Sequence, residues 1–155
     1  MARFTTTLDV PTRPRVAFDA IADFTRTVEW DDSIVSARRL DEDAIGLGSR
    51  FEVDLSLGPR TAALIYEITT YVPPTDDTAG HLVLTTQGRL HRGADDVLLH
   101  PTADGCRVEW RARFALRGPG LLLDPVLGVG FRRTATKAVA GLERFLVAEA
   151  TDRDG

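Results

Sequence analysis

The chain has 155 residues, 43% of them hydrophobic and 27% charged, which is typical of one soluble globular domain. A formal net charge of -4 argues against nucleic acid as a main partner, because phosphate binding needs a basic face. A single cysteine, Cys106, excludes an internal disulfide and fits a cytoplasmic protein, and no apolar run is long enough for a transmembrane segment.

The first predicted element is a strand over "RFTTTLDV", where apolar and polar residues alternate. The N-terminal residues contain no apolar run of the kind found in signal peptides. A helix follows in "TRPRVAFDAIADF", with Thr12 as its N-cap and Pro14 in its first turn. A second short helix or turn covers Thr25 to Trp30.

The middle of the chain is predicted to consist of strands joined by short turns. They are expected near 34–41, 49–57, 60–72, 81–90, 95–101 and 106–117. Hairpin-length connections between them predict an antiparallel meander. In the last strand the even positions from Cys106 to Leu116 are apolar and the odd positions up to Arg113 are charged, so one face is buried and the other is solvated.

A long amphipathic helix over about 121–149 is expected to close the domain, which spans 1–150 and leaves 151–155 as a frayed polar tail. The start of this helix combines apolar residues with Gly128 and Gly130. We interpret the two glycines as leaving space at the mouth of a cavity. The alternative is that they permit close contact between the helix and the sheet.

The polar side chains of the strands are mostly assigned to the solvated face. His81 and His91 are expected there, opposite Leu82 and Leu84, and Tyr71 is expected opposite Tyr66. His100 is expected outward as well, although a register slip of one residue would bring it into the cavity.

The acid pairs Asp31–Asp32, Asp76–Asp77 and Asp95–Asp96 are interpreted as solvated turn residues. No inward carboxylate and no cluster with metal-ligand spacing is expected, so no metal and no cofactor is predicted. Lys137 is the only lysine, which we interpret as codon bias of a GC-rich, bacterial genome.

Several segments together resemble the START-related helix-grip superfamily, also called the SRPBCC or polyketide cyclase/dehydrase-like group. They are "DVPTRPRVAFDAIADF", Trp30, "GLGSRF", "HPTADGCRVEW" and "LLLDPVLGVGFRRTATKAVAGLERFL". The resemblance implies an α+β fold: a curved seven-stranded antiparallel sheet wrapped around a long C-terminal helix, with two short helices after the first strand. It implies little about function, because this superfamily includes lipid carriers, cyclases and co-chaperones.

A cavity between the last helix and the sheet is the expected site. The side chains expected to face its ligand are Trp30, Phe51, Val53, Tyr66, Leu84, Thr86, Trp110, Phe114, Leu122, Val126, Val129 and Arg133. If the protein is an enzyme, the candidate catalytic groups are Tyr66 as hydrogen-bond donor, His100 as proton donor and Arg133 as oxyanion anchor.

The favoured hypothesis is a carrier or sensor that binds a hydrophobic small molecule or lipid. The alternative is a polyketide cyclase, aromatase or dehydratase that uses the same cavity. The third is a co-chaperone-like module that binds another protein. No oligomeric state is predicted.

Overall fold

The seven strands form one antiparallel sheet in the order β1-β7-β6-β5-β4-β3-β2. The computed structural model describes residues 1–119 and 124–153, and within the second range it describes the side chains of 130–152. The elements are β1 Ala2–Val10, α1 Pro14–Ala22, the 3₁₀ helix η1 Phe24–Glu29, β2 Ile34–Arg39, β3 Arg50–Leu57, β4 Arg60–Val72, β5 Gly80–Gln87, β6 His91–Pro101, β7 Cys106–Leu116 and α2 Asp124–Arg153.

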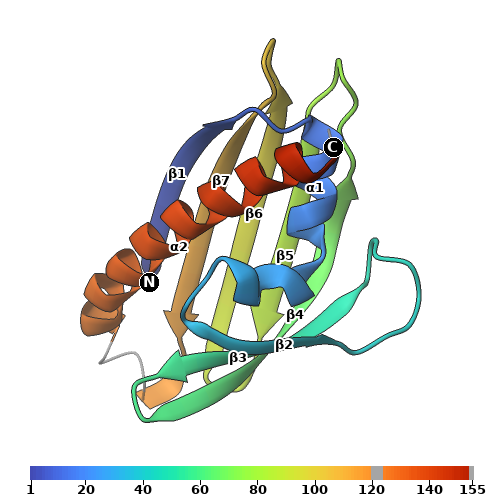
Figure 1. Cartoon of the computed structure of the whole chain (residues 1–155). Coiled ribbons are helices and arrows are strands. Elements are labelled where there is room, and N and C mark those ends of the chain that lie inside the picture. Colours follow the sequence, from blue (N-terminus) through green and yellow to red (C-terminus); the bar gives the residue numbers. More distant parts are fainter. Residues whose placement is uncertain (120–123, 154–155) are drawn as a thin grey trace.

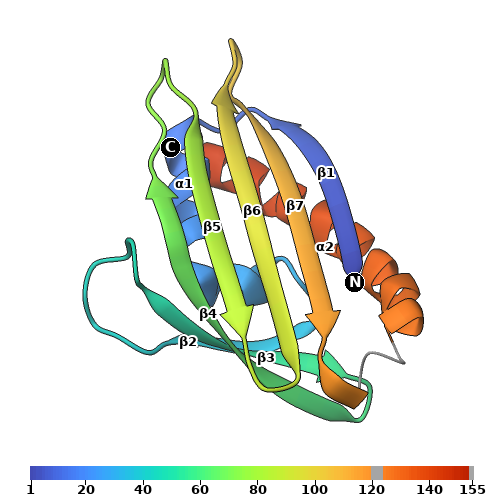
Figure 2. The same cartoon turned by 180° about the vertical axis from the view of Figure 1, so that it is seen from behind.

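The helices cover one face of the curved sheet, as the predicted fold requires. Helix α2 crosses in front of β1, β7 and β6 and ends beside α1 (Figure 1). The opposite face of the sheet is left uncovered (Figure 2). We call the covered face the inner face and the uncovered one the outer face. Arg111 and Arg113 are exposed on the outer face, and Trp110 is buried on the inner one, which confirms the predicted orientation of β7.

The hydrophobic core lies at the end of the sheet where α1 meets the last turns of α2. Inner-face residues such as Leu82, Leu99 and Val108 are fully buried there. They belong to one apolar cluster with Phe18 of α1 and Leu146 of α2. Burying each aliphatic side chain of this kind stabilises the fold by about 1.5–3 kcal/mol.

Thr12 connects these two helices in a way that the sequence did not indicate. The predicted N-cap role is wrong, because the residue at that position is Arg13 and no side chain caps α1. The Thr12 hydroxyl instead donates a hydrogen bond to the Leu146 carbonyl oxygen at 2.5 Å. The start of α1 is thereby held against the end of α2.

Strand β6 begins at His91, four residues earlier than the predicted start at 95. The chain turns at 88–90, where the Gly88 amide donates to the His91 carbonyl oxygen at 3.0 Å. The earlier start places Asp95 inside the strand rather than in a turn. The assignment of Asp95–Asp96 to a turn is therefore wrong.

A β-bulge in β4 changes which side chains face inward. The pairing with β5 shifts between Ile68 and Thr70, so Tyr71 pairs with the inward residue Leu82. The Tyr71 ring contacts the Phe18 ring edge-on, with their centroids 5.1 Å apart. The expectation that Tyr71 lies opposite Tyr66 is wrong for this reason.

One glycine of α2 allows close packing. A Cβ atom on Gly141 would lie 2.1 Å from the Trp30 carbonyl oxygen, so only glycine permits this approach of α2 to the end of η1. Gly130 is exposed, and a Cβ there would meet no atom within 4 Å. The surroundings of Gly128 are not among those that the structure describes. Helix α2 continues through Arg153, into the segment expected to fray.

Candidate functional site

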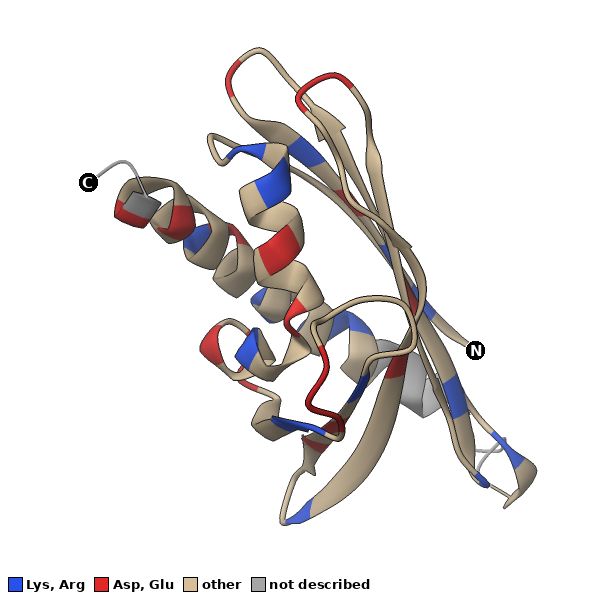
Figure 3. Ribbon diagram, turned by 90° about the vertical axis from the view of Figure 1, so that its right-hand side faces the viewer, with Lys and Arg blue, Asp and Glu red and all other residues tan. Residues whose placement is uncertain are grey.

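Burial on the inner face decreases from the α1 end of the sheet toward the opposite end. In β6, Val97 is fully buried, whereas Asp95 and His91 on the same face are partly exposed. Strand β7 shows the same change between Val108 and Phe114. Figure 3 shows that the helices lie on this side of the sheet. Asp95, His91 and Phe114 in this half are therefore only partly buried.

Asp95 lies in the middle of β6 on the inner face, between Leu84 of β5 and Ala112 of β7. The Trp110 indole N–H donates a hydrogen bond to Asp95 Oδ1 at 2.9 Å. Burial raises the pKa of Asp95 to about 6, the Trp110 hydrogen bond opposes that rise, and the charge of Asp31 adds to it. The carboxyl group therefore changes its charge close to neutral pH.

Tyr66 approaches from β4, where it pairs with Phe51 and Thr86. Its ring packs against the Phe24 ring, with centroids 5.0 Å apart. Burial raises the pKa of Tyr66 well above its ordinary value, and the charges of Asp95 and Asp31 raise it further. The phenol thus stays protonated and can donate a hydrogen bond.

Trp30 and Asp31 follow η1 and face the same region. The Trp30 and Trp110 rings meet edge-on with their centroids 5.5 Å apart. Asp31 Oδ1 accepts hydrogen bonds from the Ser33 amide at 2.9 Å and from the Ser33 hydroxyl at 2.6 Å. Burial raises the pKa of Asp31 against the lowering effect of these bonds.

His91 and Thr86 form the other end of the group. His91 Nε2 and Thr86 Oγ1 are 3.1 Å apart and hydrogen-bonded. The imidazole stacks on the Phe114 ring at 5.8 Å with an interplanar angle of 8°. Burial and the charge of Arg117 lower the pKa of His91, so the ring is neutral at pH 7.

These residues form one connected group, which we call the inner polar cluster: Trp30, Asp31, Tyr66, Thr86, His91, Asp95 and Trp110. It combines aromatic surface with hydrogen-bonding groups and one carboxyl group that titrates near pH 6. Among the described residues no group of three or more His, Cys, Asp and Glu side chains could hold a metal ion.

The sequence family described as "Polyketide cyclase / dehydrase and lipid transport" matches residues 1–147. The chain belongs to this family. The resemblance to the START-related superfamily is thereby confirmed, and so is the helix-grip fold. A comparison with curated protein sequences found no match.

Several solved structures share the fold at low sequence identity. The di-domain ARO/CYC StfQ from the steffimycin biosynthetic pathway has a TM-score of 0.73 and 16% identity, covering 99% of this chain and 52% of that one. The STAR-related lipid transfer protein from Xanthomonas axonopodis has a TM-score of 0.70 and 15% identity, with 93% and 85% covered. A START superfamily protein from Mycobacterium smegmatis has a TM-score of 0.69 and 13% identity, with 98% and 99% covered.

The side chains expected to contact the ligand, apart from Arg133, fall into three groups in the structure. Trp30, Tyr66, Thr86 and Trp110 belong to the inner polar cluster, and Phe114 stacks on His91. Phe51, Val53 and Leu84 are almost fully buried in the core. The structure describes neither Leu122 nor the side chains of Val126 and Val129.

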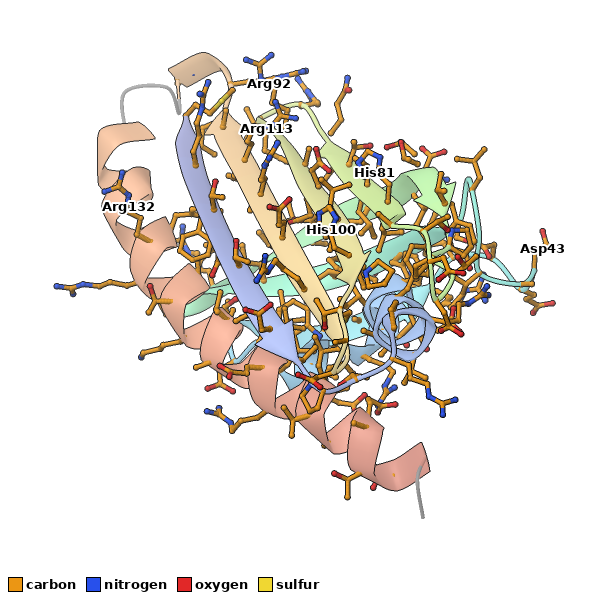
Figure 4. All side chains as sticks on the ribbon, turned by 90° about the horizontal axis from the view of Figure 1, so that it is seen from above. Asp43, His81, Arg92, His100, Arg113 and Arg132 are labelled. Carbon is orange, nitrogen blue, oxygen red and sulfur yellow. The ribbon has the colours of Figure 1, made fainter. Side chains whose placement is uncertain are left out.

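The three candidate catalytic residues do not converge. His100 lies on the outer face, where Nε2 is 3.3 Å from Glu109 Oε2, together with the outer-face residues His81 and Arg113 (Figure 4). Arg133 is exposed on α2. Only Tyr66 is a member of the inner polar cluster.

Asp95 was not among the site residues predicted from the sequence, and the predicted position of His91 on the solvated face is wrong. The signal was present in the parity of β6, because inward Val97 and Leu99 imply inward Asp95 and His91 if the strand begins early enough. Asp96, the next residue in the chain, lies on the outer face, where its Oδ1 is 2.8 Å from His81 Nε2. The two adjacent carboxyl groups therefore face opposite sides of the sheet.

A separate groove of about 570 Å³ lies where the β1–α1 loop, the β6–β7 turn and the end of α2 meet. Its lining includes Thr12, Arg13, Asp104 and Glu149. This groove is not the cavity predicted from the sequence, which is expected between the first half of α2 and the sheet. No helix in the described part of the chain is long and apolar enough to cross a membrane.

Proposed function

We propose that the chain binds a neutral hydrophobic small molecule or lipid on the inner face of the sheet, beneath α2, as a carrier or sensor. The observation that carries this proposal is the loss of burial along the inner face. Phe114, which stacks on His91, and Phe4 of β1 remain partly exposed on this face. A bound apolar molecule would cover that surface and gain about 25 cal/mol for each Å² removed from water.

The charge of the cluster favours a neutral ligand over a carboxylate. Burial raises the pKa of both Asp31 and Asp95, which means that negative charge is already unfavourable at this position. A second anion beside them would increase that repulsion. Carbonyl or hydroxyl oxygens of a neutral ligand can instead accept from Tyr66.

The test uses a matched pair of alanines on the two faces of the sheet. Ala112 of β7 is inward and partly exposed, and Ala94 of β6 is an outward residue paired with Arg113. We expect Ala112→Phe to weaken the binding of a fluorescent apolar probe at least 10-fold, because the new ring occupies the ligand's space. Ala94→Phe should leave binding unchanged.

Native mass spectrometry of the purified parent protein should detect a co-purified apolar ligand, or the added probe, in a one-to-one complex. Thermal unfolding of both variants checks that they are folded. Undiminished probe binding by a folded Ala112→Phe variant would place the ligand elsewhere and contradict the proposal.

The second candidate function is a polyketide cyclase, aromatase or dehydratase activity in the same place. The inward positions of Asp95 and His91 favour it, because such reactions need a group that moves protons inside the site. Turnover of poly-ketone mimics by the parent protein, lost in Asp95→Asn and retained in Asp96→Asn, is the result expected for this activity.

A further inference from the structure

One end of the sheet is basic, although the chain as a whole has a formal net charge of -4. The segments that meet there are 1–6, 55–66, 84–94 and 112–119, and none of them contains an aspartate or a glutamate. Figure 3 shows blue segments at this end, at the lower right of the view. We call it the basic end, and its arginines are Arg3, Arg60, Arg89, Arg92, Arg113 and Arg117.

Three of these arginines lie beside one another on the outer face. Arg3 of β1 pairs directly with Arg113 of β7, and Arg92 of β6 is a diagonal neighbour of Arg113 because it pairs with Ala115. Figure 4 shows Arg92 and Arg113 together at this end of the sheet. All three side chains are exposed, and no described residue forms an ion pair with them. Like charges directly opposite each other destabilise a sheet, so this arrangement suits an anionic partner better than it suits the fold.

Two hairpin turns place exposed leucines at the same end of the sheet. Leu90 is 63% exposed in the turn between β5 and β6, and Leu57 is 53% exposed where β3 turns into β4. Both turns lie at the lower end of the sheet in Figures 1 and 2. The Arg117 amide donates to the Leu90 carbonyl oxygen at 2.7 Å, which holds the first turn against the end of β7. Arginines flank both apolar side chains, since Arg89 precedes Leu90 and Arg60 pairs with Leu57.

We propose that the basic end docks the protein on a lipid bilayer that contains anionic phospholipids. Arginine side chains donate hydrogen bonds to the phosphate groups of the lipids, and a leucine at the tip of a turn enters the boundary between headgroups and acyl chains. An acidic protein could also pair with the arginines. The bilayer is favoured because it accounts for the exposed leucines as well as for the charge.

Docking at the basic end goes beyond the proposed ligand binding and does not depend on it. The partly exposed half of the inner face, with His91 and Phe114, lies at the same end of the strands. A docked molecule therefore holds this half of the inner face next to the bilayer. Binding to vesicles needs no other ligand, so the two proposals can fail separately.

Flotation with lipid vesicles measures the docking. At about 0.1 M salt the parent protein should bind vesicles of phosphatidylcholine with about 30% phosphatidylglycerol at least 10-fold more strongly than vesicles of phosphatidylcholine alone. The reason is that each arginine near an anionic surface contributes about fivefold to binding. Raising the salt to about 1 M should release the protein, because the charges are then screened within about 3 Å.

A matched pair of double variants tests the role of the arginines. Arg92→Gln/Arg113→Gln should weaken binding to the anionic vesicles about 10-fold or more. The control Lys137→Gln/Arg144→Gln removes the same net charge from exposed positions of α2, which covers the inner face, and should bind within about twofold of the parent. Thermal unfolding checks that both variants are folded.

A tryptophan placed in the turn reports contact with the acyl chains. The fluorescence of Leu90→Trp should be quenched by brominated phosphatidylcholine in the anionic vesicles, because this side chain enters the bilayer. The control is Leu47→Trp, at a position that is 72% exposed in the loop between β2 and β3. It should be quenched no more than the parent protein.

Failure of the parent to bind the anionic vesicles overturns the inference, and so does undiminished binding by Arg92→Gln/Arg113→Gln. Equal quenching of Leu90→Trp and Leu47→Trp would show that the turn does not enter the bilayer, which also contradicts it. Retention of the parent by immobilised polyglutamate without vesicle binding would assign the basic end to an acidic protein instead. Vesicle binding by a protein that takes up no apolar probe would contradict the proposed function and leave the docking surface standing.

Discussion

Asp95 and Asp96 show how position on a strand decides what a residue can do. They are adjacent carboxyl groups, but one contacts Trp110 on the inner face and the other pairs with His81 on the outer face. Burial raises the pKa of Asp95 to about 6. The pair is therefore a natural comparison of the same side chain in two environments.

The indole of Trp110 should control the ionisation of Asp95. We expect Trp110→Phe to raise the pKa of Asp95 above about 6, because the lost hydrogen bond stabilises the carboxylate while burial continues to destabilise it. A ¹³C NMR titration of the side-chain carboxyl carbon measures this directly. Trp30→Phe is the control and should leave the pKa of Asp95 unchanged. Trp30 contacts Trp110 through its ring, whereas the hydrogen bond to Asp95 comes from Trp110. An unchanged or lower pKa in Trp110→Phe would contradict the assignment.

At the scale of the element, two glycines of α2 should respond oppositely to the same substitution. Gly141→Ala places a Cβ atom against the Trp30 carbonyl oxygen and should lower the free energy of unfolding by about 1–3 kcal/mol, the usual cost of overpacking. Gly130→Ala meets no atom within 4 Å and should raise it by about 0.5–1 kcal/mol, because alanine favours the helix.

Urea unfolding of the two variants measures both changes, and near-UV circular dichroism reports on Trp30. Destabilisation by Gly130→Ala would mean that the space around that residue is needed for packing. A neutral Gly141→Ala would mean that α2 can move away from η1 without cost.

The elements themselves were largely predictable, because alternation and helical periodicity persist along β1, β3, β7 and the second half of α2. The start of β6 was not, because Gly93, Asp95 and Asp96 are poor strand formers. Tertiary pairing overrides that preference: a Cβ on Gly93 would lie 3.0 Å from both the Arg113 carbonyl oxygen and a Phe114 ring atom, so glycine fits between β5 and β7.

The candidate site was predictable only in part for the same reason. Tyr66, Thr86 and Trp110 were found because they lie among apolar inward residues of long strands. Asp95 and His91 were missed because their inward orientation depends on where β6 begins. The bulge that turns Tyr71 inward has no local sequence signal, since it arises from the pairing of β4 with β5.

For the whole molecule, the two ends of the inner face have different tasks. The end at α1 is closed by apolar contacts and supplies stability, whereas the opposite end carries polar groups that stability alone would not select. An ionised Asp95 in that position costs folding free energy. The global stability of the protein should therefore depend on pH through this residue.

The sign follows from the raised pKa. Folded protein binds a proton at Asp95 as the pH falls through about 6, whereas the unfolded chain does so only near the ordinary aspartate value of about 4. The stability that Asp95 contributes is therefore fully present below about pH 4 and is lost as the pH rises to about 6. Asp95→Asn keeps an acceptor for the Trp110 N–H and cannot ionise.

We expect Asp95→Asn to be more stable than the parent at pH 8, with a difference that shrinks as the pH falls toward 4, in urea unfolding at a series of pH values. Tyr66 and His91 face the same region and are present in both proteins. Asp31 is coupled to Asp95 through its charge, so removal of the Asp95 charge also relieves Asp31 and enlarges the difference at high pH. Asp43→Asn should not show this trend, because its side chain is exposed in the loop between β2 and β3. A parent protein that is more stable than Asp95→Asn at pH 8 would show that the ionised carboxylate is stabilised by its surroundings, which contradicts a pKa raised to about 6.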